Sequence, residues 1–283
     1  MSLADHVADW RPGELTVSET IAPAPAARLA GILDGPGVAP AAGDPLPPLW
    51  HWLYFLDWPA QSGLGADGHP ADGHFLPPIP SRTRMFAGGR LRVDAPLEVG
   101  ADAVRTSSLA GVKVKQGRSG ELLFVTVRNE IRQRGELCLS EEQDLVYRSG
   151  GGGTASHEVV QEEPVSRAPW RLPLRADPAL LFRFSAVTAN AHRIHYDLPY
   201  ARDVENYPGL VVHGPLLAVL MAELPRAHAP ERRVSALAYR FRRPVFAGEP
   251  VLVTGEPEDA GARLAVVDAA GTVRADARAE FAP

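Results

Sequence analysis

Hydrophobic and polar residues alternate along two separate stretches of the chain, and glycine-containing turns divide each stretch into short segments. Val- and Thr-rich segments separated by such turns are typical of an antiparallel sheet. The predicted strands cover residues 103–115, 121–133 and 137–147 in the first stretch and 250–256, 262–268 and 272–281 in the second. We therefore expect two antiparallel sheets of similar plan.

The two stretches also begin alike, which indicates a degenerate duplication. Leu91-Arg-Val is followed by Pro96-Leu-Glu-Val-Gly100, and Tyr239-Arg-Phe is followed without a gap by Pro244-Val-Phe-Ala-Gly248. Each unit predicts a strand that bends at a proline and restarts after a glycine turn.

One apolar segment precedes each predicted sheet, over residues 49–58 and 214–224. The second is apolar nearly all round, which suits a helix enclosed by a sheet. This order predicts an α+β fold with two curved antiparallel sheets, each wrapped around a central helix.

A length of 283 residues suits two modules of roughly 130 residues each. We expect a first domain over residues 1–148 and a second over 170–283. The Gly-, Glu- and Pro-rich stretch over 149–169 is typical of a flexible linker. The loop over 59–80 is long for a compact domain, and such loops are often functional or mobile.

Composition narrows the classes of protein. The net charge of -5 and the pI near 6.0 argue against a large nucleic-acid footprint. No apolar run approaches the ~20 residues that cross a bilayer, and no secretory signal is visible, so a cytoplasmic location without membrane contact is expected. The single cysteine excludes an intrachain disulfide.

The strongest chemical signal lies between residues 185 and 216, where an amide, a carboxylate and three histidines precede a glycine at the start of the apolar helix. These residues are Asn190, His192, His195, Asp197, His213 and Gly214. Histidine is well matched to moving protons near neutral pH. Backbone N–H groups at a helix N-terminus can hold a developing negative charge. Such groups are the parts needed to add water to an activated double bond, or to remove it.

The two segments, Asn190-Ala-His-Arg-Ile-His-Tyr-Asp197 and Tyr207-Pro-Gly-Leu-Val-Val-His-Gly214-Pro-Leu, resemble the motif of the MaoC-like, R-specific enoyl-thioester hydratases. That family has the hotdog fold, so the resemblance implies a double hotdog. The variant resembles a subgroup with mesaconyl-CoA and itaconyl-CoA hydratases and fungal-type mitochondrial 3-hydroxyacyl-thioester dehydratases. First-half segments that match the subgroup are Leu49-Trp-His-Trp52, Met85-Phe-Ala-Gly-Gly-Arg90 and Glu141-Glu-Gln-Asp-Leu-Val-Tyr-Arg148.

The resemblance implies roles for residues of the second segment. His195 falls on the family's catalytic His and is expected to transfer protons. Asn190 falls where the family has its catalytic Asp and is expected to orient the attacking water, and Gly214 N–H is expected to bind the thioester oxygen. Because an amide cannot act as a base, either His192 takes the missing role or His195 acts alone.

Other residues are candidates for binding the substrate. Arginine suits bidentate contacts with phosphate or carboxylate, although a solvated strand face with ordinary ion pairs is an equal alternative. His51, His69 and His74 are expected to shape the tunnel mouth. The candidate binding residues are Arg82, Arg84, Arg90, Tyr196, His213 and Arg242.

A metal set built from His192, His195, Asp197 and His213 lacks the His-Glu-x-x-His pattern, and Arg193 inside it would repel a cation, so no metal is expected. The resemblance implies a hydro-lyase that acts on an acyl-CoA, without a cofactor, because coenzyme A is part of the substrate. We expect a short branched dicarboxylic substrate, mesaconyl-C4-CoA or itaconyl-CoA, giving citramalyl-CoA. A 3-hydroxyacyl-CoA or 3-hydroxyacyl-carrier-protein dehydratase and a non-catalytic acyl-thioester binding module are the alternatives. Exposed sheet edges further predict a homodimer.

Overall fold

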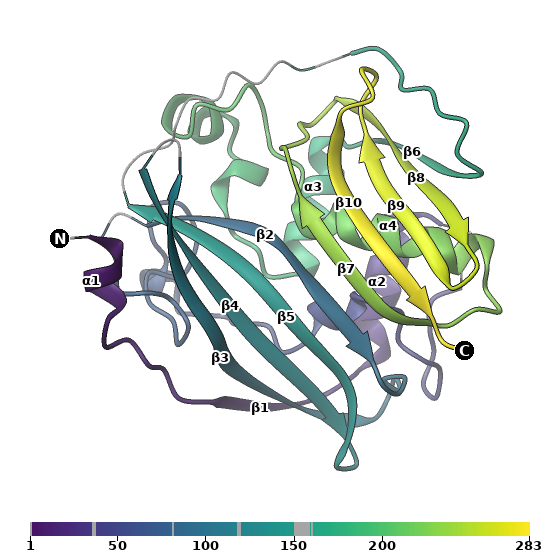
Figure 1. Cartoon of the computed structure of the whole chain (residues 1–283), viewed down its shortest axis with the longest axis horizontal. Helices are drawn as coiled ribbons and strands as arrows, with labels where there is room; N and C mark the ends of the chain where they lie inside the picture. Colours follow the sequence, from purple (N-terminus) through teal and green to yellow (C-terminus); the bar gives the residue numbers. More distant parts are fainter. Residues whose placement is uncertain (1, 36–37, 81, 118–119, 150–158, 160) are drawn as a thin grey trace.

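The ten strands of the described part of the chain form one antiparallel sheet in the order β1-β3-β4-β5-β2-β7-β10-β9-β8-β6 (Figure 1). The computed structural model describes the chain except for residues 1, 36–37, 81, 118–119, 150–158 and 160. Ten of the 21 residues of the predicted linker, 150–158 and 160, therefore lie outside the described residues.

The strand order of the second half mirrors that of the first, as a duplication predicts. The first half contains β1 (Leu15–Thr20), β2 (Arg82–Val93), β3 (Asp102–Gly117), β4 (Gly120–Gln133) and β5 (Glu136–Ser149). The second contains β6 (Trp170–Arg175), β7 (Val234–Phe241), β8 (Pro250–Glu258), β9 (Gly261–Val267) and β10 (Val273–Phe281). The six strands predicted from alternation and turns are all present, and the fold class is confirmed.

The halves meet where β2 pairs with β7, and two glycines of β2 make this approach possible. A Cβ on Gly88 would lie inside contact distance of the Tyr239 carbonyl oxygen, and one on Gly89 would overlap the Tyr239 hydroxyl. The Tyr239 hydroxyl donates to the buried Glu141 carboxylate at 2.9 Å, and Glu141 also accepts from Trp52. A buried carboxylate therefore links the two halves.

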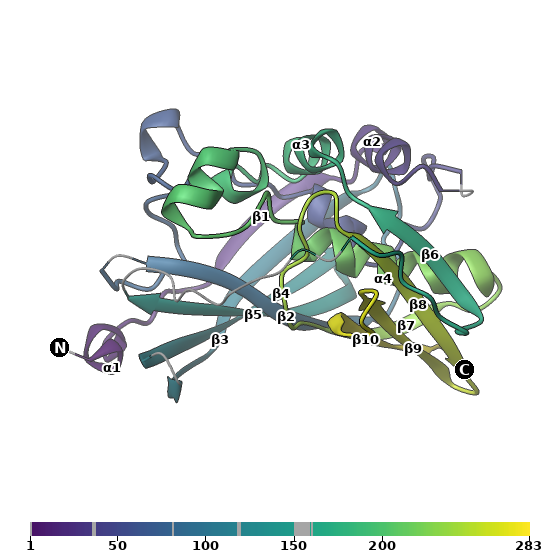
Figure 2. The same ribbon diagram turned by 90° about the horizontal axis from the view of Figure 1, so that it is seen from above.

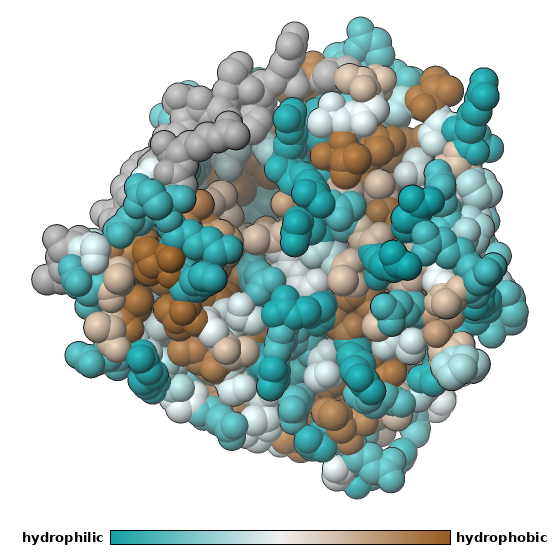
Figure 3. Space-filling model, viewed as in Figure 1, coloured by the Kyte–Doolittle hydropathy of each residue, from teal (hydrophilic) through white to brown (hydrophobic). Residues whose placement is uncertain are grey.

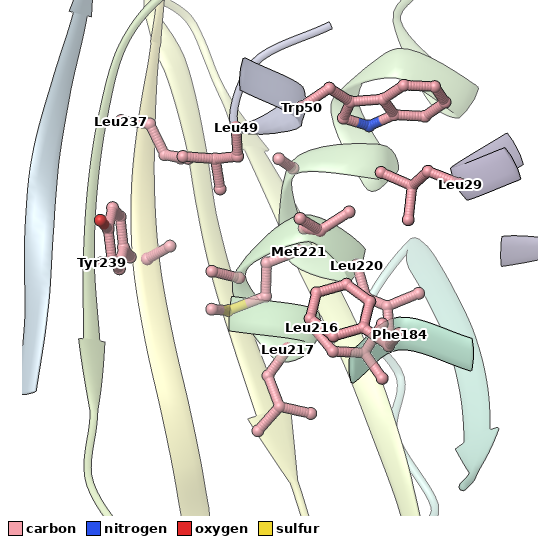
Figure 4. Packing of buried hydrophobic residues seen from close by; sticks show 14 of the residues in the cluster. Leu29, Leu49, Trp50, Phe184, Leu216, Leu217, Leu220, Met221, Leu237 and Tyr239 are labelled. Atoms are coloured by element: carbon pink, nitrogen blue, oxygen red, sulfur yellow. The ribbon is translucent and has the colours of Figure 1, made fainter. Parts of the chain in front are cut away.

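The core of the second half is α4 (Gly214–His228), which contacts all five strands of that half, β6–β10. Pro215 suits its first turn, where the backbone N–H has no partner within the helix. Side chains on several faces of the helix are buried, as an all-round apolar segment predicts. Figure 4 shows Leu216, Leu217, Leu220 and Met221 of α4 among side chains from several other elements.

The first half differs from the expected plan because its apolar segment does not form a long helix. Only Trp50–Leu53 forms one 3-10 turn, η1. Leu49 and Phe55 both have positive φ, of 69° and 55°, so a helix cannot extend past the segment in either direction. The indole of Trp50 donates to Glu223 of α4 at 3.0 Å, so η1 packs against the helix of the other half.

The remaining helices are short. Two of them, α2 (Pro23–Leu33) and α3 (Pro178–Val187), lie side by side on the same side of the sheet as α4 (Figure 2). The others are α1 (Leu3–Val7), η2 (Gln61–Gly63), η3 (Arg193–His195) and the π-helical turn η4 (Tyr200–Val204). Among the described residues, no helix is long and apolar enough to cross a membrane.

Candidate active site

His195 ends the short helix η3 and is almost fully buried, with 6% of its surface exposed. Its Nδ1 lies 2.7 Å from the Val211 carbonyl oxygen. A carbonyl oxygen only accepts, so Nδ1 carries the proton and Nε2 of the neutral ring is left as an acceptor. The local fold therefore sets one tautomer of His195.

Behind His195 lies His213, the residue that precedes α4. The two rings stack with centroids 3.6 Å apart, and His213 Nε2 lies 2.9 Å from the Ser185 hydroxyl. His213 has no exposed surface, and burial holds its pKa well below the ordinary value. It therefore supports the ring of His195 from the protein interior.

His192 lies between His195 and a histidine of the first half. Its ring is 5.6 Å from that of His195 and 4.1 Å from that of His69. Burial, followed by the charges that His69 and His195 would carry, lowers the pKa of His192 to about 2. Burial also lowers the pKa of His195 to about 4. The four rings of His69, His192, His195 and His213, called the imidazole row below, are therefore neutral near pH 7.

The loop over residues 59–80 brings His69 to the second half. His69 Nδ1 lies 2.9 Å from Asp67 Oδ2, and Arg193 N donates to the Asp67 carbonyl oxygen at 2.8 Å. Gly68 has a φ of 89°, and a Cβ there would overlap the Ala191 carbonyl oxygen. The sequence interpretation missed the pairing of Asp67 with His69, although the unusual length of the loop was a signal of function.

Asn190 precedes η3, and Gly214 begins α4. The Asn190 Oδ1 accepts from His192 N at 3.0 Å, and this turn fixes the side chain. Gly214 is the first residue of α4, and the first N–H groups of a helix have no partner within it. A Cβ on Gly214 would lie 3.1 Å from the Phe241 ring, which explains why glycine suits this position.

Two adjoining cavities lie in this region, and Asn190 lines one of them. The smaller, of about 350 Å³, is lined by His69, Asn190 and Pro215 among others. The larger, of about 490 Å³, lies in the first half, against β3, β4 and β5. Both have five lining residues in common, Trp52, Asp57, Pro70, Arg84 and Gln143. Of the imidazole row, His69 is the member that lines the smaller cavity.

The candidate arginines differ in what surrounds them. Arg84 lines both cavities and makes no ion pair with a described residue. Arg90 pairs with Glu142 and Asp144, and Arg242 pairs with Asp276. Arg82 begins β2, but its side chain lies outside the described part of the structure.

Two further expectations concern Tyr196 and a metal. Tyr196 is half-exposed, and its hydroxyl donates to the Ala191 carbonyl oxygen at 3.0 Å, so it braces the segment before η3. Within the described residues, Asp67, His69 and His192 have ligand atoms within 4.8 Å of one another, a spacing that could hold a metal ion. This group differs from the set considered from the sequence, which was His192, His195, Asp197 and His213. Asp197 of that set is paired with Arg193.

Residues 49–247 match the family model of hydroxyacyl-thioester dehydratase type 2. The chain belongs to this family and is therefore a hydro-lyase of the hydratase and dehydratase type.

The chain is 48% identical to the mesaconyl-C(4)-CoA hydratase of Chloroflexus aurantiacus over 91% of each chain. It is 26% identical to the mitochondrial hydroxyacyl-thioester dehydratase type 2 of Schizosaccharomyces pombe, over 74% of this chain and 77% of the relative. The crystal structure of HtdX from Mycobacterium tuberculosis has the same fold, with a TM-score of 0.65, 17% identity, and coverage of 95% of this chain and all of the other. A MaoC-like dehydratase from Phytophthora capsici gives a TM-score of 0.68 at 13% identity, over 99% of this chain and 98% of the other.

Proposed function

We propose that this chain hydrates an enoyl-CoA whose acyl group carries a second carboxylate, with mesaconyl-C4-CoA or itaconyl-CoA as substrate and citramalyl-CoA as product. The relative that is 48% identical bears the name of a hydratase for such a substrate. The observation that carries the proposal is Arg84, a guanidinium beside both cavities that has no carboxylate partner among the described residues.

Arg84 is suited to the carboxylate of a short acyl group. In mesaconyl-C4-CoA this carboxylate is attached to the β-carbon, so its partner must lie close to the groups that handle the water. Arg84 lies close enough to the imidazole row for its charge to lower the pKa of both His69 and His192. A guanidinium can bind a carboxylate through two parallel hydrogen bonds, which also orients the β-carbon.

The reaction needs a proton acceptor for water, a proton for the α-carbon and a donor for the thioester oxygen. His195, with a free Nε2, is the motif residue that we propose holds and activates the attacking water, with Asn190 fixing its position. As the water oxygen bonds to the β-carbon, the double-bond electrons move to the thioester oxygen. Gly214 N–H stabilises that charge until a proton reaches the α-carbon.

Exchange of Arg84 tests the substrate assignment. In Arg84→Leu, the ratio of kcat/KM for mesaconyl-C4-CoA to that for crotonyl-CoA should fall on the order of 10²-fold, because charge-assisted hydrogen bonds are lost. Arg90→Leu is the matched control, since Arg90 lies on the same strand and is already paired. An unchanged ratio in Arg84→Leu would contradict the proposal that Arg84 binds a second carboxylate of the acyl group.

A second candidate, dehydration of 3-hydroxyacyl groups on coenzyme A or acyl carrier protein, is favoured by the larger cavity. A volume of about 490 Å³ beyond Arg84 has room for an acyl chain longer than a branched C5 unit. Turnover that rises with chain length from C4 to longer 3-hydroxyacyl thioesters would favour this candidate.

We also propose a cytoplasmic homodimer that uses no cofactor. Strands β1 and β6 are the two ends of the sheet, and unpaired strand edges readily join other chains. The outer face of the sheet mixes hydrophilic and hydrophobic side chains (Figure 3), so the edges are the better candidates for the interface. Sedimentation of a species near twice the 30.4 kDa of one chain is expected, and a monomer at micromolar concentration would contradict it.

A further inference from the structure

His69 differs from the other members of the imidazole row in two respects. It lines the cavity that Asn190 and Pro215 also line, and its Nδ1 lies 2.9 Å from a carboxylate oxygen, Asp67 Oδ2. In the rest of the row, His195 Nδ1 faces a carbonyl oxygen and His213 Nε2 faces a hydroxyl. The imidazole that lines the cavity, that of His69, is therefore the one with a carboxylate within hydrogen-bonding distance.

This difference matters because addition of water creates a positive charge on whichever imidazole takes the proton. A buried cation without a negative partner is costly, whereas a carboxylate within hydrogen-bonding distance stabilises it. A carboxylate on Nδ1 also fixes the tautomer, so that Nε2 is the proton acceptor. Asn190 cannot supply this charge, since its side chain is a neutral amide.

We propose that His69, held by Asp67, is a catalytic acid–base residue of this site, supplied by the loop of the first half to the hydratase motif of the second. The inference rests on the proposed hydration of an enoyl-CoA, but not on the identity of the acyl group. His195 still holds the attacking water, and His69 receives its proton.

One residue, His69, both accepts the proton from water and returns it to the substrate. One O–H bond of water breaks as the oxygen bonds to the β-carbon, and the proton goes to His69 Nε2. The π electrons of the double bond move onto the thioester as an enolate. The enolate then takes the same proton at the α-carbon, which returns His69 to its neutral form. Asp67 stays ionised throughout: burial acts to raise its pKa, but its bonds to His69 lower the value to about 2.

Hydrogen bonds fix the loop over residues 59–80 against the second half, and they hold His69 beside the hydratase motif. Arg193 donates from its backbone to Asp67 and from its guanidinium to the Ala66 carbonyl oxygen at 2.9 Å. Gly68, which lies between Asp67 and His69, has no Cβ and so allows the Ala191 carbonyl to approach the loop. The charged and titratable neighbours of His69 are Asp67 on its own loop, Arg84 on β2, and His192 and His195. Burial and Arg84 lower the pKa of His69, and Asp67 opposes them.

The test compares His69→Gln, Asp67→Asn and the control Asp72→Asn, with Asp72 exposed on the same loop. Crotonyl-CoA is the substrate, so the result does not depend on whether Arg84 binds a substrate carboxylate. His69→Gln should lower kcat by a factor on the order of 10²–10⁴, while the Kd for butyryl-CoA and the Tm stay close to those of the wild type. Asp72→Asn should retain the wild-type kcat.

Asp67 is a positioning residue, so its variant is judged by the pH profile. Asp67 raises the pKa of His69, and its removal should move the acidic limb of kcat/KM to lower pH as well as lower kcat. A purely structural role of Asp67 would lower activity equally at every pH. This second variant removes one charge with little change of volume, so it keeps the proposal testable if His69→Gln fails to fold.

Three outcomes would overturn the proposal. One is wild-type kcat in His69→Gln, and another is an unshifted pH profile in Asp67→Asn. The third is activity that is lost on dialysis against a chelator and restored by a divalent cation, which would make Asp67, His69 and His192 metal ligands. Hydration of crotonyl-CoA but of no dicarboxylic substrate would remove the substrate assignment and leave His69 in place. No turnover of any enoyl-CoA would remove both.

Discussion

The two halves of the sheet have the same strand order in mirror image, yet one is filled and the other is hollow. In the second half, α4 occupies the concave face, and side chains such as Leu216 and Met221 are fully buried. In the first half, the corresponding segment is the single turn η1, and a cavity of about 490 Å³ lies against β3–β5. The same sheet therefore packs into a filled core where a long helix covers it and borders an open cavity where the helix is reduced to one turn.

The comparison also shows which half supplies each residue of the candidate site. In the proposed site, the second half supplies Asn190, His195 and the N-terminus of α4, whereas the first supplies Arg84 and the Asp67–His69 pair. Neither half contains both sets, so each depends on the other. The glycines of β2 and the buried Glu141 network hold the halves in register.

The largest expected effect is on the second half. His195→Ala should lower kcat by a factor on the order of 10²–10⁴, because the hydrogen-bond acceptor that holds and orients the attacking water is removed. Binding of butyryl-CoA should hardly change. The control is His228→Gln, an exposed histidine at the end of α4. A His195→Ala enzyme with wild-type kcat would show that His195 does not hold the attacking water.

Truncation of leucine should cost more in the filled half than in the hollow one. Leu216→Ala removes a fully buried side chain of α4 and should lower the free energy of unfolding by about 2–5 kcal/mol. Leu145→Ala, on the wall of the larger cavity, should cost less than about 2 kcal/mol, since one side of Leu145 already faces open space. Urea denaturation measures both values, and equal losses would contradict the contrast.

A side chain at Gly68 would strain the contact between the loop of the first half and the second half. Gly68→Ala should cost about 1–3 kcal/mol of stability and reduce kcat, because the positive φ and the Ala191 carbonyl both exclude a Cβ. Gly63→Ala in the same loop meets only ordinary contact with Pro59 and is the matched control. If both variants keep wild-type kcat, the loop does not position catalytic groups.

A smaller effect is expected from pH. The pKa of His195 is lowered from 6.5 to about 4 and that of His192 to about 2. Between about pH 6.5 and 4 the unfolded chain therefore binds more protons than the folded one, so stability should fall as the pH falls through this window. The slope is at most about 1.4 kcal/mol per pH unit for each histidine. Urea denaturation at several pH values measures it, and His195→Gln should flatten it.

Much of the fold was predictable because local patterns determine it. Alternation and glycine turns give β3, β4, β5, β8, β9 and β10, and the all-round apolar run gives α4. Apolar composition alone does not separate a helix from an irregular buried segment, so the single turn of η1 was not foreseen.

Of the candidate site, the sequence predicted a cluster only in the second half. Asn190, His192, His195 and Gly214 belong to one motif, and the structure brings them close to one another. The pairing of Asp67 with His69, and the contact of His69 with His192, depend on how two distant segments pack. No spacing along the chain encodes such a contact.

The central claim, that this chain adds water to an enoyl-CoA carrying a second carboxylate, has a direct measurement. The purified protein is mixed separately with mesaconyl-C4-CoA, itaconyl-CoA and crotonyl-CoA, and the conversion of each thioester to its hydrated product is followed by chromatography and mass spectrometry. We predict rapid conversion of at least one dicarboxylic substrate and a higher kcat/KM for it than for crotonyl-CoA. Equal or faster turnover of crotonyl-CoA, or no conversion of either dicarboxylic thioester, would contradict the account.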